Sequence, residues 1–349
     1  MSFSHKILGW YYENKRALPW RETTDPYKIW LSEIILQQTR VAQGTPYYLR
    51  FVEAFPTVTH LANAKEEEVL KLWQGLGYYS RARNLHTAAK MVVNTYNGDF
   101  PNTYKELLNL KGVGDYTASA ISSISFGEPQ AVVDGNVYRV LGRYFGIDIP
   151  VNSSEGIRYF RTLAQEVMDE SKARDYNQGI MEFGAMHCKP KNPYCLHCPL
   201  NESCVALQKG DVDQLPVKIK KTKIRNRYFN YLVPIAEDAS GQVFTSLRQR
   251  KGRGIWQNLW EFPLLESETN LDGEAIDIQY KSVLKNFEAY EIISFNEKPI
   301  VHKLSHQNLH TTFWILKTKG QIEDKIPFQS LIDFPVPVLI AEFIKAYKI

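Results

Sequence analysis

The sequence predicts a mainly helical N-terminal part and a smaller α+β part, joined by a basic segment. Up to about residue 210, apolar residues recur at helical spacing, as in YKIWLSEIILQQTRVAQ and YFRTLAQEVMDE. From about residue 226, short β-type runs such as YFNYLVPIA and TTFWILKT replace them. Between the two, LPVKIKKTKIRNRYF (215–229) has six Lys or Arg and no acid. Such a segment is either a solvated linker or a strip that lies along a phosphate backbone.

Length and composition set broad limits on the class of protein. A chain of 349 residues with 44% hydrophobic residues suits about two globular domains rather than a disordered chain. The formal net charge of +4 only mildly favours an anionic partner. No stretch approaches about 18 uninterrupted apolar residues, and MSFSHKILGWYYENK at the start lacks the apolar core of a signal peptide. We therefore expect a cytoplasmic protein without a membrane span.

All four cysteines lie within MHCKPKNPYCLHCPLNESC (186–204), with gaps of six, two and five residues. Disulfides across such small loops would add little stability, and the expected compartment is reducing. Clustered thiolates indicate tetrahedral zinc or an iron-sulfur cluster, while four unrelated buried thiols are the third possibility. One wrapped loop, rather than two CxxC-like knuckles far apart, favours a cluster. The candidate ligands are Cys188, Cys195, Cys198 and Cys204.

The stretch LLNLKGVGDYTASAI (107–121) predicts two helices joined by a tight turn. Leucines close the first helix, Gly112 and Gly114 make the turn, and Thr117 opens the second helix. Glycines let a backbone approach closely and amides at a helix N-terminus suit a phosphate, while Lys111 adds positive charge beside the turn. An ordinary turn between two antiparallel helices is the alternative.

Two carboxylates stand where both a structural and a catalytic role are open. Asp134, in AVVDGNVYRVLGRYFG (131–146), follows an apolar run and precedes a helix, so a helix N-cap is its structural interpretation. Glu33, in WLSEIILQQTR (30–40), is either a solvated acid or a buried one. Its apolar neighbours offer a route to a raised pKa.

Taken together, these motifs resemble the MutY-type adenine DNA glycosylases of the helix-hairpin-helix superfamily, which includes endonuclease III. The matching motifs, in order over nearly all of residues 1–210, are LPWR (18–21), WLSEIILQQT (30–39), GLGYYSRARNL (75–85), LKGVGDYTASA (110–120), VDGNVYRV (133–140) and the cysteine set. In addition, RGIWQNLWEFP (253–263) resembles the Nudix-like domain appended to such proteins.

The resemblance implies three regions. Residues 1–210 would form a helix-hairpin-helix glycosylase domain that holds a [4Fe-4S] cluster in the loop 188–204. Residues 211–226 would be a basic linker, and residues 227–349 a Nudix-like domain that recognises the lesion. A working Nudix hydrolase needs a Glu-rich helix that binds magnesium, and none follows Pro263, so diphosphate hydrolysis is not expected.

The resemblance also implies the reaction, which is hydrolysis of the N-glycosidic bond of adenine mispaired with 8-oxoguanine or guanine in double-stranded DNA. Such cleavage requires an acid on the base side and an anion on the sugar side. Glu33 resembles the acid that protonates N7 of adenine, and Asp134 resembles the carboxylate that stabilises or captures the sugar cation. Asn136 resembles the residue that orients this pair.

Position 116 separates members of the superfamily. Endonuclease III relatives have a lysine nucleophile two residues past the second hairpin glycine, whereas this chain has Tyr116. Without that amine we expect a monofunctional glycosylase that leaves an abasic site. Position 138 is Tyr138 rather than the lysine of some relatives, which should weaken only incidental crosslinking to DNA.

Further residues are implied as DNA contacts. The adenine pocket would contain Trp20, Arg21, Leu36 and Gln178. Extrusion of adenine leaves a gap in the duplex, and Gln38 and Tyr78 resemble the residues that fill it, with Gln37 nearby. The residues that would contact the backbone are Lys111, Gly112, Gly114, Lys189 and Lys191.

The loop HKLSH (302–306) resembles the segment that reads 8-oxoguanine, through Leu304, Ser305 and His306. Many relatives have Phe where this chain has Leu304, so stacking at that position is not implied. We expect a monomer with no nucleotide cofactor, and the hairpin turn leaves room for a cation. Two other interpretations stay open, namely an endonuclease III-like pyrimidine glycosylase with lyase activity and a non-catalytic DNA-binding redox protein.

Overall fold

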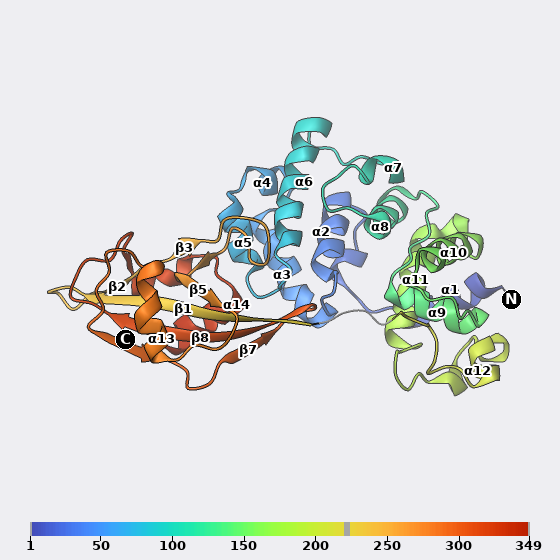
Figure 1. The fold of residues 1–349 in the computed structure, drawn as a ribbon. Helices are drawn as coiled ribbons and strands as arrows, with labels where there is room; N and C mark the ends of the chain where they lie inside the picture. The colour runs from blue at the N-terminus through green and yellow to red at the C-terminus, as the bar shows by residue number, and fades with distance from the viewer. Residues whose placement is uncertain (1, 220–223, 348–349) are drawn as a thin grey trace. The chain divides into compact units, whose positions relative to one another are not determined.

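The computed structural model describes residues 2–219 and 224–347, and within them the chain forms two compact units. The first unit contains residues 2–64 and 84–219 and is helical, whereas the second contains 65–83 and 224–347 and is built on a β-sheet (Figure 1). The predicted order, helices first and α+β second, is confirmed. The predicted domain ranges stay a prediction, although Lys65–Arg83 packs with the C-terminal unit rather than with its sequence neighbours. Residues 220–223 of the predicted basic linker lie outside the described residues.

The helical unit is made of short helices joined by tight turns. Within the described ranges, none of the helices is long and apolar enough to cross a membrane. Its elements are α1 (Phe3–Asn14), η1 (Pro19–Arg21), α2 (Pro26–Leu36), α3 (Val41–Ala54), α4 (Val58–Asn63), α7 (Tyr104–Leu107), α8 (Asp115–Phe126), α9 (Gly135–Phe145), α10 (Ser154–Glu166), η2 (Glu170–Lys172), α11 (Ala173–Met186), η3 (Cys195–His197), η4 (Asn201–Ser203) and α12 (Val205–Lys209). The boundary between the two units at residues 83 and 84 falls within α6 (Ser80–Tyr96).

Two helices form the centre of this unit. α2 packs against α3 and α8, and it is apolar around nearly its whole circumference, with Trp30 and Ile35 fully buried. α11 packs against α1, α8 and α9. A helix buried on all sides carries its polar residues into the interior as well. As a result, Glu33 of α2 and Glu182 of α11 are both buried carboxylates.

The sheet of the second unit is organised around two long strands. β1 (Arg225–Glu237) and β8 (Gln307–Lys317) run parallel, with Tyr228 opposite His310. Among the described strands the order is β6-β8-β1-β2-β9, with β5 paired to β1 and β7 paired to β8. The remaining elements of this unit are α5 (Glu66–Trp73), β2 (Val243–Thr245), β3 (Arg248–Gln249), β4 (Trp260–Glu261), β5 (Leu264–Ser267), α13 (Gly273–Gln279), η5 (Tyr280–Ser282), β6 (Glu291–Ser294), β7 (Ile300–Lys303), β9 (Ile326–Pro327), η6 (Phe328–Asp333) and α14 (Val338–Ala346).

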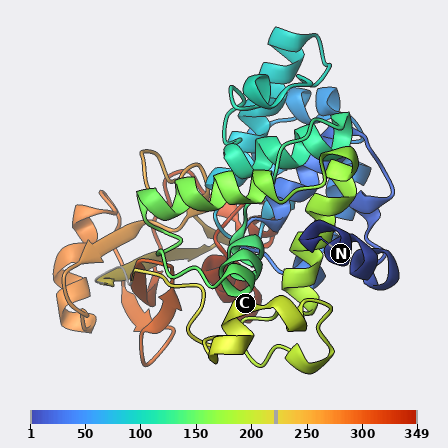
Figure 2. The same ribbon diagram turned by 90° about the vertical axis from the view of Figure 1, so that its right-hand side faces the viewer.

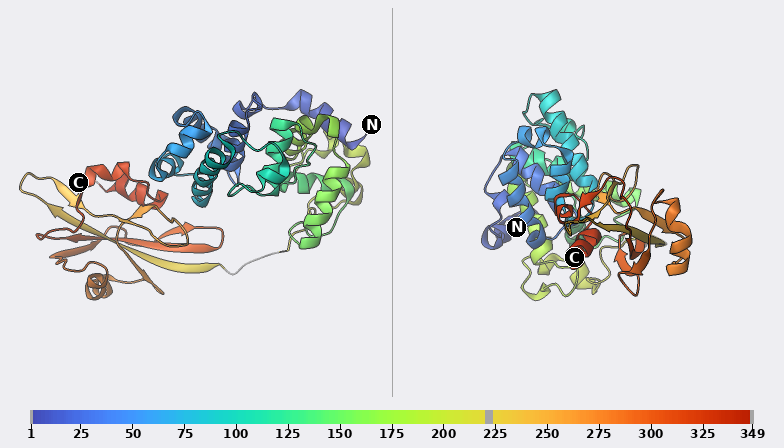
Figure 3. Two further views of the ribbon diagram at one scale, coloured as in Figure 1. Left: turned by 90° about the horizontal axis from the view of Figure 1, so that it is seen from above. Right: turned by 90° about the vertical axis from the view of Figure 1, so that its left-hand side faces the viewer.

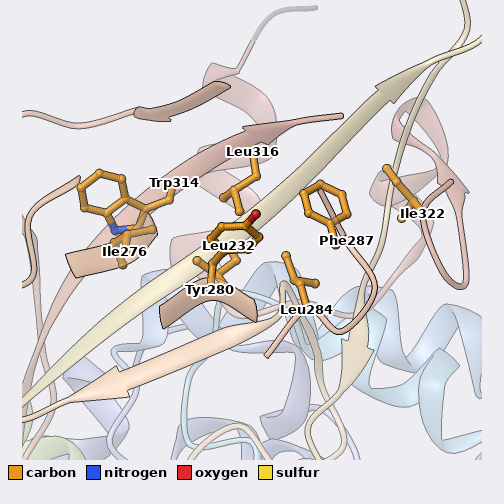
Figure 4. Close-up of a cluster of buried hydrophobic side chains, with 8 residues drawn as sticks. All are labelled: Leu232, Ile276, Tyr280, Leu284, Phe287, Trp314, Leu316 and Ile322. Atoms are coloured by element: carbon orange, nitrogen blue, oxygen red, sulfur yellow. The ribbon is translucent and has the colours of Figure 1, made fainter. Parts of the chain in front are cut away.

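A helix covers each face of this sheet (Figure 3). On one face Ile276 of α13 packs with Trp314, and on the other Phe343 of α14 stacks on Phe313 with ring centroids 4.2 Å apart. Side chains alternate along a strand, so these two successive residues of β8 supply two different cores. The core under α13 contains Leu232, Ile276, Tyr280, Leu284, Phe287, Trp314, Leu316 and Ile322 (Figure 4).

Candidate active site

Glu33 is the buried carboxylate of α2, with a relative exposure of 8%. Its Oε2 accepts a hydrogen bond of 2.6 Å from the Tyr116 hydroxyl. Burial raises the pKa of Glu33 from 4.5 to about 7, the Tyr116 hydrogen bond opposes this rise, the Asp134 charge adds to it, and the Arg21 charge opposes it. This raised pKa lets the carboxyl keep its proton closer to neutral pH than an ordinary Glu does, so it can act as a proton donor.

Asp134 occupies the N-cap of α9, as the sequence predicts. Its Oδ1 accepts from the backbone N–H groups of Asn136 and Val137, both at 2.8 Å, and its Oδ2 accepts from Asn136 Nδ2 at 2.7 Å. Burial raises the pKa of Asp134 above its ordinary value, although these three hydrogen bonds oppose the rise by stabilising the anion. The two carboxylates thus differ in environment, because Asp134 accepts from three donors and Glu33 accepts from the Tyr116 hydroxyl.

Asn136 is held from two sides. Its Oδ1 accepts from Arg139 Nη2 at 2.9 Å. Gly184 packs tightly against it on the other side, because a Cβ atom added at Gly184 would lie only 2.6 Å from the Asn136 Cβ. Arg139 also donates to the carbonyls of Gly184 at 2.6 Å and Cys188 at 2.7 Å. One guanidinium therefore connects the Asp134 end of the site to the start of the cysteine loop. Sequence analysis missed Arg139, whose spacing of three from Asn136 on α9 was the available signal.

The predicted hairpin lies between α7 and α8. Gly112 has a φ of +78°, and a Cβ there would lie 2.7 Å from the Asn84 side chain, so this position requires glycine. Gly114 is the N-cap of α8, which starts at Asp115 and not at Thr117 as the sequence predicts. The earlier start puts Tyr116 in the first helical turn.

The hairpin shares a cavity with part of the predicted site. Gln37, Gly112, Gly114 and Tyr116 line this cavity, and Gln37 Nε2 donates to Thr117 Oγ1 at 3.4 Å. Lys111 is exposed. A cation at the hairpin turn stays a prediction.

Two of the four residues predicted for the adenine pocket line the same cavity. Arg21 and Gln178 line a cavity together, and Gln178 Oε1 accepts from the Tyr11 hydroxyl at 3.1 Å. Trp20 is buried and packs edge-on against Tyr48, with ring centroids 5.2 Å apart. Leu36 is half-buried at the end of α2. Their role around adenine stays a prediction.

Arg21 belongs to an ion-pair cluster around the buried Glu182, which sequence analysis missed. Glu182 of α11, with 1% exposure, accepts from Arg16 Nη2 at 2.6 Å and from Arg21 Nη2 at 2.8 Å. The signal in the sequence was weak, because Glu182 follows Gln178 by four residues and so shares its helical face. Acids at that spacing also occur on the solvated face of surface helices.

The two predicted intercalating residues have unusual backbones. Gln38 has a φ of +54° and Tyr78 a φ of +47°, a region that residues of this size rarely adopt. Both side chains are exposed. Backbone strain of this kind concentrates at functional sites, and it therefore supports a functional role for Gln38 and Tyr78.

The loop at 304–306 forms the turn between β7 and β8. It is fixed by a hydrogen bond from the backbone N–H of Leu304 to the Gln307 carbonyl at 2.8 Å. Ser305 and His306 are exposed. The Ser305 hydroxyl lies 2.5 Å from the hydroxyl of Tyr78, which belongs to the same unit. Two predicted contacts that are far apart in the sequence therefore meet.

The four cysteines line one small cavity. Their loop is the yellow-green segment at the lower end of the helical unit in Figure 2, next to α12. Arg143 Nη1 lies 3.4 Å from Cys188 Sγ and donates to the Lys189 carbonyl at 2.7 Å. Lys189 and Lys191 are exposed.

The four thiols form one donor set around a shared cavity. Across the described part of the chain, no group of three or more His, Cys, Asp or Glu is placed to hold one metal ion. All four thiols nevertheless surround the same cavity. Cysteine thiolates are ligands of iron-sulfur clusters and of zinc, so the chemistry of this donor set fits either group.

Comparison with known proteins defines the class first. Residues 31–160 match the HhH-GPD superfamily of base excision DNA repair proteins, and residues 232–346 match the NUDIX domain. The solved structure of a thermostable thymine-DNA glycosylase is 33% identical, with a TM-score of 0.56, and the match covers 59% of this chain and 95% of that one. The chain is therefore a DNA glycosylase of the helix-hairpin-helix class with a Nudix-like C-terminal region.

The relatives define the family within this class. The adenine DNA glycosylase of Buchnera aphidicola subsp. Baizongia pistaciae (strain Bp) is 34% identical over 324 residues, which is 92% of this chain and 88% of that protein. The adenine DNA glycosylase of Rattus norvegicus is 33% identical over 374 residues, covering 92% of this chain and 71% of that protein. The chain belongs to the adenine DNA glycosylase family, which confirms the predicted resemblance.

Proposed function

We propose that this enzyme removes adenine mispaired with 8-oxoguanine or guanine in double-stranded DNA, as a step of base excision repair. Family membership supports the base and the pathway. The observation that carries the proposal is the pair of carboxylates, in which buried Glu33 accepts a hydrogen bond from Tyr116 and the charge of half-buried Asp134 acts on both Glu33 and Tyr116.

The chemistry follows from the two environments. Glu33 donates its proton to N7 of the extruded adenine, which turns the base into a better leaving group. Asp134 acts in its anionic form, which its three hydrogen bonds stabilise, and it stabilises or transiently captures the sugar cation. Asn136 keeps Asp134 aligned through the 2.7 Å hydrogen bond. Water then completes the hydrolysis and leaves an abasic site.

We infer that the enzyme is monofunctional. A lyase of the endonuclease III type forms a Schiff base through a lysine amine, and the phenol of Tyr116 stands at the corresponding position and donates to Glu33. Treatment with borohydride during turnover should therefore trap no stoichiometric adduct between protein and DNA. An adduct formed on oxidised pyrimidines would support the lyase interpretation.

DNA recognition involves both units. Gln38 and Tyr78 fill the gap left by adenine, and exposed lysines on the hairpin and the cysteine loop contact phosphates. Ser305 and His306 contact the 8-oxoguanine that stands opposite the adenine. The enzyme acts as a monomer. The hydrogen bond between the Tyr78 and Ser305 hydroxyls supports a joint role in DNA recognition for Tyr78 and the loop at 304–306.

The direct test is release of adenine from a duplex with adenine opposite 8-oxoguanine, detected as strand cleavage after alkali. Wild type should cleave, and its single-turnover rate should fall as pH rises through about 7, because only protonated Glu33 can donate. A rate that stays level up to pH 9, about two units above that pKa, would contradict the acid role.

Loss of the Ser305 hydroxyl should weaken lesion discrimination. We expect Ser305→Ala to lower the ratio of single-turnover rates on A:8-oxoguanine and A:G duplexes by about threefold to tenfold, the value of one hydrogen bond. Ser294→Ala, at an exposed position on β6 of the same unit, is the matched control. An unchanged ratio in Ser305→Ala would remove this residue from the reading of 8-oxoguanine.

We propose that Cys188, Cys195, Cys198 and Cys204 hold a [4Fe-4S] cluster that folds the loop and takes no part in the chemistry. Cys198→Ser should lose bound iron and lower the affinity for duplex DNA by about tenfold or more, because the loop with its lysines is no longer ordered. Iron content, visible absorption and a binding titration measure this. Ser203→Ala, a change within the same loop, should keep its iron, and a Cys198→Ser protein with full iron would refute the ligand set.

A further inference from the structure

We propose that Arg143 couples the cysteine loop to the basic segment, so that a group bound by the four thiols keeps residues 215–219 fixed to the helical unit. This coupling rests on the cluster proposed above and is independent of the carboxylate pair. It gives a role to a buried side chain that the reaction does not use, and to a segment that the sequence predicts to be a linker.

Arg143 is a residue of α9 and is only 3% exposed. Its Nη1 donates to Cys188 Sγ at 3.4 Å and to the Lys189 carbonyl at 2.7 Å, and its Nη2 donates to the Pro190 carbonyl at 3.1 Å. The third nitrogen, Nε, donates to the Leu215 carbonyl at 3.0 Å. One guanidinium thus joins the start of the cysteine loop to the start of the basic segment.

The basic segment stays on the helical unit beyond Leu215. The Val217 carbonyl accepts from the backbone N–H of Val151 at 3.0 Å. Asn152 then makes two hydrogen bonds with Ile219, because its Nδ2 donates to the Ile219 carbonyl at 2.9 Å and its Oδ1 accepts from the Ile219 N–H at 2.8 Å. Leu215 and Val151 are both buried. Backbone and side-chain hydrogen bonds therefore fix this part of the segment to the turn between α9 and α10.

The buried charge of Arg143 has its counter-charge in the thiol cavity. A guanidinium is always protonated in proteins, and buried charges are normally paired. In the part of the chain that the structure describes, no carboxylate forms an ion pair with Arg143. The residue does line the cavity of the four thiols, and cysteines bind a metal as thiolate anions. A bound group therefore supplies the negative charge that keeps this guanidinium buried.

Loss of the bound group should loosen both segments that Arg143 joins. Neutral thiols do not compensate the guanidinium, so its burial becomes unfavourable and it leaves the site for solvent. Residues 215–219 then lose the hydrogen bond at Leu215 and separate more often from the turn that contains Val151. Because these residues lead to the second unit, their release lengthens the connection between the two units.

Hydrogen exchange of the Val151 amide tests the coupling, because this amide donates to Val217 and belongs neither to the cysteine loop nor to the basic segment. Iron content is measured on the same full-length samples. We expect Cys198→Ser to lose its iron and to exchange the Val151 amide about tenfold faster than wild type, the effect of one lost hydrogen bond. Arg143→Gln should give the same acceleration. In the double variant Arg143→Gln/Cys198→Ser the two effects should not add, because both act through one guanidinium.

Two further variants separate charge from hydrogen bonding. Arg143→Lys keeps the positive charge but loses the planar fork that reaches several carbonyls, so it should retain iron while the Val151 amide exchanges faster. This variant and Cys198→Ser still decide the matter if Arg143→Gln does not fold. Arg158→Gln removes a positive charge at an exposed position on α10 and should match wild type in both measurements.

Unchanged exchange of the Val151 amide in iron-free Cys198→Ser would overturn the coupling, and so would additive effects in the double variant. Amides of the buried helix α2 serve as an internal reference, and equal acceleration there would mean global unfolding and would also count against it. Failure of the proposed cluster looks different, because wild type would then contain no iron. Failure of the proposed reaction would appear as absent adenine release and would move neither readout.

Discussion

Glu33→Gln should abolish adenine release, with the single-turnover rate on an A:8-oxoguanine duplex lowered by about a hundredfold to ten-thousandfold. Gln fills the same volume on α2 but has no proton to give to N7. Affinity for the duplex should persist, because Gln38, Tyr78 and the exposed lysines proposed to contact DNA are unchanged. The paired measurements are single-turnover cleavage after alkali and a binding titration, and detectable turnover by the variant would refute the acid assignment.

The same substitution should stabilise the fold above neutral pH. The pKa of Glu33 is about 7 in the folded protein against an ordinary value of 4.5, so the folded state holds this proton more tightly. Below about pH 4.5 the carboxyl is protonated in both the folded and the unfolded state, so its ionisation does not lower the free energy of unfolding. As pH rises through 7, ionisation of the buried group removes up to about 3 kcal/mol of stability, which Gln would not lose.

Thermal unfolding measured at two pH values shows whether the substitution stabilises the fold above neutral pH, as expected. Glu33→Gln should melt above wild type at pH 8 and close to it at pH 4, about the values where ionisation of Glu33 is complete and absent. Glu155→Gln, at an exposed position on α10, is the control and should show no such dependence. An equal difference at both pH values would mean that ionisation of Glu33 is not its source.

Asp134→Asn should lower the rate by about a hundredfold to a thousandfold while it leaves α9 intact. Asn serves as an N-cap nearly as well as Asp, so the hydrogen bonds to the first turn can persist. The lost feature is the negative charge opposite the developing sugar cation. Binding and melting temperature should stay near wild type, which separates this outcome from a folding defect.

A second helix supplies the matched control. Asp272 is the N-cap of α13, where its side chain accepts from the backbone N–H of Ala275 at 2.9 Å. Asp272→Asn repeats the same chemical change in the second unit and should leave the rate unaltered. If Asp134→Asn retained more than about a tenth of the wild-type rate, the carboxylate would be a cap and no more.

The amino-acid sequence by itself determined the features that depend on short spacing. Four cysteines within one loop, Asp134 ahead of a helix and the paired hairpin glycines all follow from neighbours along the chain. The order of a helical and an α+β part follows from apolar periodicity in the same way. Even locally, one boundary was wrong, because Gly114 caps α8 and starts it at Asp115 rather than Thr117.

Only the tertiary structure decided which distant residues share an environment. The partners of Glu182 lie 161 and 166 residues away, and the Tyr78 and Ser305 hydroxyls that meet are separated by 227 residues. The same holds for Lys65–Arg83, which packs with the C-terminal unit. Burial and long-range charge depend on how whole helices pack, and these set the pKa of Glu33. Sequence motifs therefore identified the two carboxylates, whereas packing decided their burial and their hydrogen-bond donors, and burial raises the pKa of both.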